Sequence, residues 1–172
     1  MNRGHNVEKL LELSEIKAIK IFINTKWLLQ NAMKDNLNAS DIMIKILAIE
    51  NYFNKNNFGM SWYNNMQRIR VSQNKKIDIN KADNEKNFIK LIENIKSNGF
   101  DEQYPIELNK NFEVFEGSHR LACALYFNIE RIPVTFNKYV WDLEYDYSIN
   151  WFVKNGMLDY ISEIKNKYKE YI

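Results

Sequence analysis

The chain contains a single cysteine, Cys123, among its 172 residues. One thiol cannot form an internal disulfide framework or a cysteine-rich zinc site. The chain also has almost no excess of positive or negative charge, because it contains 24 basic and 22 acidic residues. A dedicated nucleic-acid-binding protein usually carries a clearer basic excess, so a DNA partner is possible but not favoured.

The N-terminal residues contain no long apolar run. Residues 1–6 lead into a charged amphipathic stretch, whereas a signal peptide or a membrane span needs an uncharged apolar segment. We therefore expect a cytoplasmic protein with no membrane partner. Apolar residues make up 45% of the chain, including four Trp, ten Tyr and ten Phe, which is ample for a hydrophobic core.

The spacing of apolar residues in the first half predicts helices alone. Ser40 stands where an N-cap belongs, before apolar residues that recur at helical spacing as far as Phe53. Arg68 and Arg70 either reach an anionic substrate or lie on a solvated helix face, and we favour the solvated face. The expected helices cover residues 7–20, 25–35, 40–53 and 61–71.

The second half alternates short strands with helices. Asn98 and Gly99 form a helix-stop signal, and Pro133 suits an edge strand or the start of a strand. The expected strands are 76–80, 104–108, 112–115 and 132–136, and the expected helices are 83–98, 118–127, 141–154 and 157–170. We expect the aromatic residues of the last two helices to lie in the core or an interface: Trp141, Tyr145, Tyr147, Trp151 and Phe152.

One segment, residues 114–125, reads as a strand that passes through a glycine turn directly into a helix. Ser118 stands at the expected N-cap, and His119 and Arg120 follow it. A helix start of this kind presents unpaired N–H groups on one side, and Arg120 adds a planar, two-pronged donor. This combination suits a phosphate group.

The order of these segments resembles the ParB/sulfiredoxin-like superfamily. The resemblance is carried by residues 95–100, by Pro105 and Ile106, by the Glu-Gly-Ser-His-Arg-Leu-Ala run at 116–122 and by residues 129–134. It implies an α+β fold with a small mixed β-sheet as its core. The implied division is a helical N-terminal extension at 1–74, a core at 75–138 and C-terminal helices at 139–172 that pack on the core.

The resemblance also implies that a nucleotide phosphate sits on the turn. This phosphate would be held by Gly117, Ser118, His119 and Arg120. Glu116 would either help to bind the cofactor by coordinating a metal ion or simply end an exposed strand. ATP and ADP are the favoured nucleotides, CTP is possible, and Mg²⁺ is a possible companion.

The branches of the superfamily differ at single positions of the turn. Sulfiredoxins need a cysteine where this chain has Ser118, and Cys123 fits the helix core instead. Partition proteins carry an Arg-rich turn and a further DNA-reading domain, for which the tail is too short. The turn is most similar to that of the free-serine-kinase-like branch, which places a carboxylate between the first strand and the first helix.

Asp83 and Glu85 stand at that place in this chain. We interpret them, with His119, as candidate catalytic residues, either of the carboxylates acting as general base or holding Mg²⁺. The sequence predicts no other metal site. The leading hypothesis is a phosphotransferase or nucleotide hydrolase that acts on a small hydroxylated molecule. The alternative is a non-catalytic nucleotide switch or DNA-associated module, a nuclease is disfavoured, and a homodimer is possible.

Overall fold

The computed structural model describes residues 21–34, 37–55, 57–73, 85–137 and 147–172. Within these ranges the protein is α+β, as predicted, with a four-stranded sheet and seven helices. The strands are β1 (Ile21–Asn24), β2 (Ile106–Leu108), β3 (Val114–Glu116) and β4 (Arg131–Phe136). The helices are α2 (Thr25–Met33), α3 (Ser40–Asn54), α4 (Gly59–Gln73), α5 (Glu85–Asn98), α6 (Ser118–Tyr126), α7 (Ile149–Lys154) and α8 (Asp159–Lys169).

The sheet has the strand order β1-β4-β2-β3. β4 lies antiparallel to β1 and parallel to β2, while β2 and β3 form an antiparallel pair with an irregular register. Pro133 therefore lies on an interior strand rather than on an edge. The parallel pairing starts at Val134, one residue later, which leaves the proline outside that ladder.

Strand β1 corrects the prediction that the first half is purely helical. Residues 21–24 pair with β4, and the Thr25 hydroxyl donates a hydrogen bond to the carbonyl oxygen of Ile129 at 2.8 Å. The Asn24 side chain then caps α2 by accepting a hydrogen bond from the Trp27 N–H. The N-terminal segment thus supplies one strand of the sheet as well as helices.

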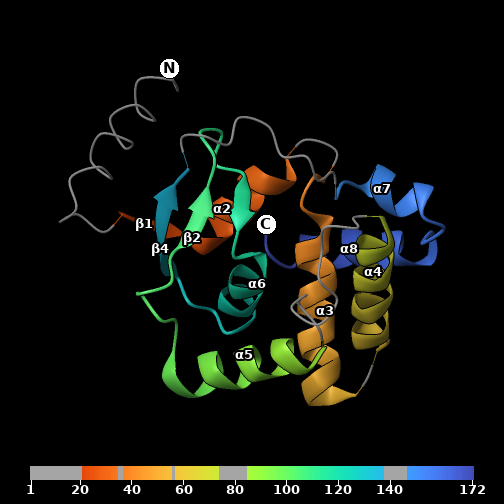
Figure 1. The fold of residues 1–172 in the computed structure, drawn as a ribbon, viewed down its shortest axis with the longest axis horizontal. Coiled ribbons are helices and arrows are strands. Elements are labelled where there is room, and N and C mark those ends of the chain that lie inside the picture. Colours follow the sequence, from red (N-terminus) through yellow and green to blue (C-terminus); the bar gives the residue numbers. More distant parts are fainter. Residues whose placement is uncertain (1–20, 35–36, 56, 74–84, 138–146) are drawn as a thin grey trace.

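Helix α3 is the centre of the molecule. All ten residues from Ser40 to Ile49 are buried, as expected for a helix that is apolar around its whole circumference. In Figure 1, α3 and α4 lie side by side, α6 lies between α3 and the sheet, and α5 runs along one end. Two of the ten buried residues, Asp41 and Lys45, are charged, and a buried charge requires a partner.

The remaining predictions divide into three groups. The helix that ends at Asn98 is confirmed, and Gly99 adopts the positive φ expected of a C-terminal cap. Ser40 is the first residue of α3 instead of its N-cap, and its hydroxyl donates to the carbonyl oxygen of Leu37. The helix at 7–20, the strand at 76–80 and residues 138–146, which include Trp141 and Tyr145, lie outside the described residues. No helix in the described ranges is long and apolar enough to cross a membrane.

Candidate functional site

The turn between β3 and α6 depends on Gly117. Its φ of +98° lies in the left-handed region, and a Cβ at this position would stand 2.8 Å from the Ile106 Cδ1 and 3.0 Å from the Arg120 Nη2. Glycine is therefore the N-cap, and α6 begins at Ser118. This corrects the prediction that Ser118 caps the helix, and it leaves the hydroxyl available for another contact.

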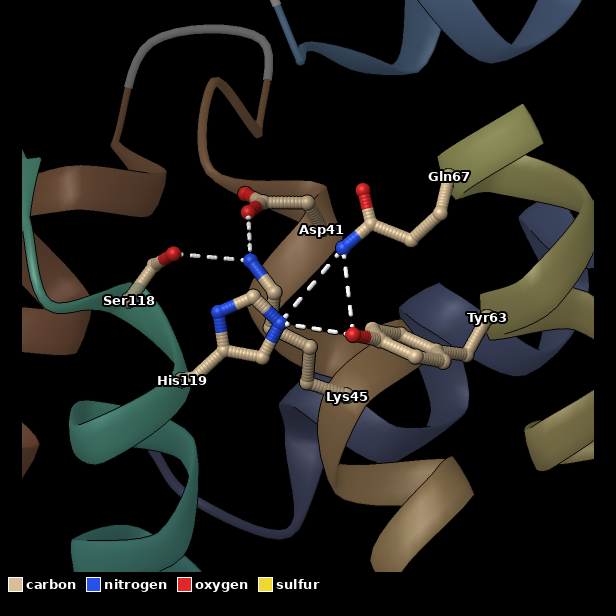
Figure 2. Close-up of polar contacts among 6 residues, drawn as sticks. All are labelled: Asp41, Lys45, Tyr63, Gln67, Ser118 and His119. Carbon is tan, nitrogen blue, oxygen red and sulfur yellow. Dashed lines mark hydrogen bonds and ion pairs between the residues drawn. The ribbon is translucent and has the colours of Figure 1, made fainter. Parts of the chain in front are cut away.

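That contact is with Lys45. The Lys45 Nζ donates a hydrogen bond to the Ser118 Oγ at 2.7 Å and forms an ion pair with the Asp41 carboxylate one turn earlier on α3. Only 3% of the Lys45 side chain and 9% of the Asp41 side chain are exposed. We call these three residues the charged network. It joins the start of α6 to the middle of α3, as Figure 2 shows.

The charged network borders a pocket of about 510 Å³. This volume falls within the range of pockets that bind small molecules and cofactors. The wall comes from α2, α3, α4, β3, the start of α6 and the segment before α7. Its residues are Ala32, Asn38, Ala39, Asp41, Ile42, Lys45, Arg70, Asn111, Glu113, Val114, Phe115, Glu116, Ser118 and Tyr147.

The ionised residues of the pocket are of both signs. Lys45 and Arg70 are cationic, and the Arg70 guanidinium lies 6.0 Å from the centre of the Tyr147 ring. Asp41 is neutralised by Lys45. Glu116 ends β3, and Glu113 belongs to the turn that leads into this strand. The pocket can therefore bind an anion on its helical side and a cation or a hydroxyl group beside β3.

Arg70 thus lines a pocket, contrary to the solvated helix face that we favoured from the sequence. Arg68, on the same helix, is exposed as predicted. Tyr147 also lines the pocket, whereas Phe152 is fully buried in the core, so the predicted role of the aromatic tail holds for only part of it.

His119 belongs to a second set of contacts, which joins α6 to α4. Its Nε2 lies 3.0 Å from the Tyr63 hydroxyl, which also accepts a hydrogen bond from the Gln67 Nε2 at 3.2 Å. The ring packs edge-on against Tyr63 and Phe88, with centroids 5.6 and 4.9 Å away. We call His119, Tyr63 and Gln67 the neutral network. Figure 2 shows that the two networks leave adjacent residues of α6.

Burial lowers the pKa of His119 well below its usual value near 6.5, and the charges of Lys45 and Arg70 lower it further. The imidazole is therefore neutral at pH 7. A neutral ring does not attract a phosphate by charge. The structure places His119 behind the pocket wall, joining α6 to α4.

Arg120 contacts the backbone rather than the pocket. Its Nη1 donates hydrogen bonds to the carbonyl oxygens of Tyr104 and Pro105, the latter at 3.0 Å. Burial lowers the pKa of the guanidinium, and the nearby Glu116 charge opposes this shift. In this arrangement Arg120 fixes the chain that enters β2 to the first turn of α6.

Of the two predicted catalytic carboxylates, only Glu85 belongs to the described part of the chain, and it does not line the pocket. Asp83 lies outside the described residues. Glu85 is the first residue of α5, where its carboxylate accepts a hydrogen bond from the Asn64 side chain. No group of three or more His, Cys, Asp or Glu suitable for a metal ion occurs in the described ranges. Of the predicted turn residues, Glu116 and Ser118 line the pocket.

Asp41, Lys45 and Glu113 were missed by sequence reasoning. The signal for the first two was present, because they stand four residues apart in a helix that is otherwise apolar from Ile42 to Ile49. A charged pair at this spacing inside a fully buried helix indicates a polar site within the core.

Comparison with known proteins yields no assignment: no family model, curated protein or solved structure matches the chain.

Proposed function

We propose that the pocket binds a nucleotide and that the protein is a phosphotransferase or nucleotide hydrolase with a ParB/sulfiredoxin-like core. One observation carries the proposal. The buried Lys45 ammonium is hydrogen-bonded to the Ser118 hydroxyl where α6 starts, and both residues line a pocket of about 510 Å³. A fixed cation beside a helix start is a favourable place for a phosphate group.

Three kinds of donor would hold the phosphates. The first N–H groups of α6 have no acceptor within the helix, Ser118 offers its hydroxyl, and Lys45 and Arg70 supply positive charge. Lys45 would act as a point charge and Arg70 as a planar donor from the opposite helix. The order α5, β2, β3, α6, β4 supports the superfamily assignment, since the resemblance rests on that order of elements.

The charge balance of the pocket favours Mg²⁺ as a companion of the nucleotide. Two cations face three carboxylates in the pocket wall, and a di- or triphosphate adds further negative charge. Mg²⁺ is commonly held by one or two carboxylates together with phosphate oxygens and water. Glu113 and Glu116, beside the phosphate donors, would serve that purpose.

Glu116 is also the best-placed candidate for the general base. Its carboxylate is exposed at the end of β3, and it lines the same pocket as Ser118. It would take the proton from a hydroxyl of the acceptor as the phosphoryl group is transferred, or from water in a hydrolase. This role replaces the one predicted for Glu85, whose carboxylate is bonded to Asn64.

The experiment is a thermal-shift and calorimetric titration of the full chain with ATP, ADP, CTP and GTP, with and without Mg²⁺. A nucleotide at one hundred times its dissociation constant should raise the free energy of unfolding by about 2.7 kcal/mol. Arg70→Gln should weaken binding about tenfold or more, and Ser118→Ala should weaken it several-fold. Arg68→Gln is the matched control, because Arg68 is exposed on the same helix and should leave binding unchanged.

Turnover separates the enzyme from the switch. A phosphotransferase or hydrolase should release nucleoside diphosphate or phosphate, and Glu116→Gln should lower turnover about 100-fold, whereas nucleotide binding measured without Mg²⁺ should persist. Binding without turnover in the presence of candidate hydroxylated acceptors would favour the nucleotide switch. If no nucleotide binds the wild-type protein, the proposal is wrong.

A further inference from the structure

Phe115 is an exposed aromatic residue in the wall of the pocket. It lies in β3, the last strand of the sheet, and 43% of its surface is accessible to solvent. An exposed ring in a pocket wall offers a flat apolar surface to a ligand.

The pocket wall holds both apolar and charged side chains, and Phe115 lies on β3 between Glu113 and Glu116. Val114 precedes Phe115, and Ala32, Ala39 and Ile42 belong to the same wall. The other aromatic ring of the pocket, Tyr147, already packs under the Arg70 guanidinium and edge-on to Trp151 at 5.4 Å. Phe115 is thus the aromatic ring best exposed for a new partner.

The presence of an exposed aromatic ring and two cations in one pocket identifies the class of ligand. Inorganic pyrophosphate or a sugar phosphate would engage Lys45, Arg70 and Ser118 but would leave Phe115 in contact with water. A phosphate ester that carries a flat aromatic ring would engage both the cations and Phe115. The pocket volume of about 510 Å³ suits a ligand of that size better than a bare phosphate.

We infer that the base of the bound nucleotide stacks on Phe115, an inference that rests on the proposed nucleotide function. The phosphates lie at Lys45, Ser118 and Arg70, and the base lies against β3. Stacking uses the π-face that every base has, so Phe115 contributes affinity without strong preference for one base. Discrimination between bases comes from the polar residues around it, such as Asn38 and Asn111.

The test compares ADP and CDP with pyrophosphate, all with Mg²⁺, in calorimetric titrations of the full chain. The wild-type protein should bind the nucleotides at least tenfold more tightly than pyrophosphate. Phe115→Ala should remove most of this difference by weakening nucleotide binding about tenfold, with pyrophosphate affinity unchanged. Phe115→Tyr should retain tight nucleotide binding, because it keeps the ring.

The control variant is Phe58→Ala. Phe58 is 71% exposed just before α4, and it does not belong to the pocket wall. Its removal should affect neither ligand. Circular dichroism of each variant confirms that the fold is retained.

The outcomes separate the two proposals. If pyrophosphate binds as tightly as ADP and CDP, or if Phe115→Ala weakens all three ligands equally, the stacking inference is overturned while the phosphate site stands. If the wild-type protein binds none of them, the nucleotide function fails and the stacking inference fails with it.

Discussion

Two hydrogen-bonded networks begin at consecutive residues of the same helical turn. They differ in the charge of their members and in whether they border the pocket. Ser118 contacts Lys45, which is paired with Asp41, and this charged network borders the pocket. His119 contacts Tyr63, which is bonded to Gln67, and this neutral network lies in the core between α4 and α6. Successive residues at a helix start point in different directions, so one turn serves two functions.

Under the proposed function, this difference divides the site into a part that binds the ligand and a part that holds the helices in place. The charged network presents groups that a ligand can reach. The neutral network holds α4 against α6, and Arg70 follows Gln67 by one turn on α4. Tyr63 and His119 therefore fix the distance between Arg70 and Ser118, on opposite sides of the pocket, without contacting a ligand themselves.

The largest effect should come from breaking the charged network at its centre. Lys45→Met leaves the buried Asp41 carboxylate without its cation, which should lower the free energy of unfolding by about 3–5 kcal/mol. Chemical denaturation measures this loss.

The double variant Asp41→Asn/Lys45→Met tests the cause. Removing both charges should recover most of the stability, because a buried ion pair can be replaced with little net cost. If the double variant is as unstable as Lys45→Met alone, the loss reflects packing around the lysine stem rather than an uncompensated charge.

The second effect concerns the neutral network. Tyr63→Phe removes a hydroxyl that lies 3.0 Å from His119 and accepts a hydrogen bond from Gln67, so it should cost about 1–3 kcal/mol of stability. Nucleotide affinity should change by no more than about threefold, since Tyr63 does not line the pocket. A large loss of affinity with unchanged stability would contradict the separation of the two networks. Denaturation and calorimetry on the same variant provide both values.

The smallest effect is a pH dependence that only the neutral network should show. The pKa of folded His119 lies below its value near 6.5 in the unfolded chain. As the pH falls below about 6.5, the unfolded chain gains a proton that the folded protein does not, so stability decreases, by up to about 1.4 kcal/mol per pH unit.

Denaturation midpoints between pH 7.5 and 5.5 measure this slope. The chain has two histidines, His5 and His119, so His119→Gln isolates the contribution of the second. The slope should flatten in this variant. A slope that persists in His119→Gln would assign the pH dependence to other groups.

The sequence predicted most of the fold where the pattern is local. The helix over 40–53 and the helix stop at Gly99 follow from apolar spacing and glycine chemistry, and both are present. Strand β1 was missed because four residues are too few to distinguish alternation from the flanking helical pattern. Its pairing partner, β4, is remote in the sequence and leaves no local signal.

The turn that the sequence analysis singled out borders the pocket, but its side chains have other partners than expected. The expectation placed Ser118, His119 and Arg120 around one phosphate, whereas the structure directs them to Lys45, to Tyr63 and to the backbone before β2. Lys45 comes from a helix seventy-three positions away, and only tertiary packing brings it to the turn. Local sequence can identify a helix start, but it does not specify which residues of other elements approach it.

The long-range attachment of β1 has a consequence for how the chain is made. Thr25 hydrogen-bonds to Ile129, 104 positions later, and among the described strands β1 pairs with β4 alone. During synthesis, residues 21–24 therefore have no pairing partner until residues 131–136 leave the ribosome. Helices α3 and α4 can pack together before that point. Pairing of such distant segments slows folding. A chain that stops before β4 would leave Ile21, Phe22 and Ile23 without their pairing partner. We therefore expect the risk of aggregation during translation to fall once β4 has been made.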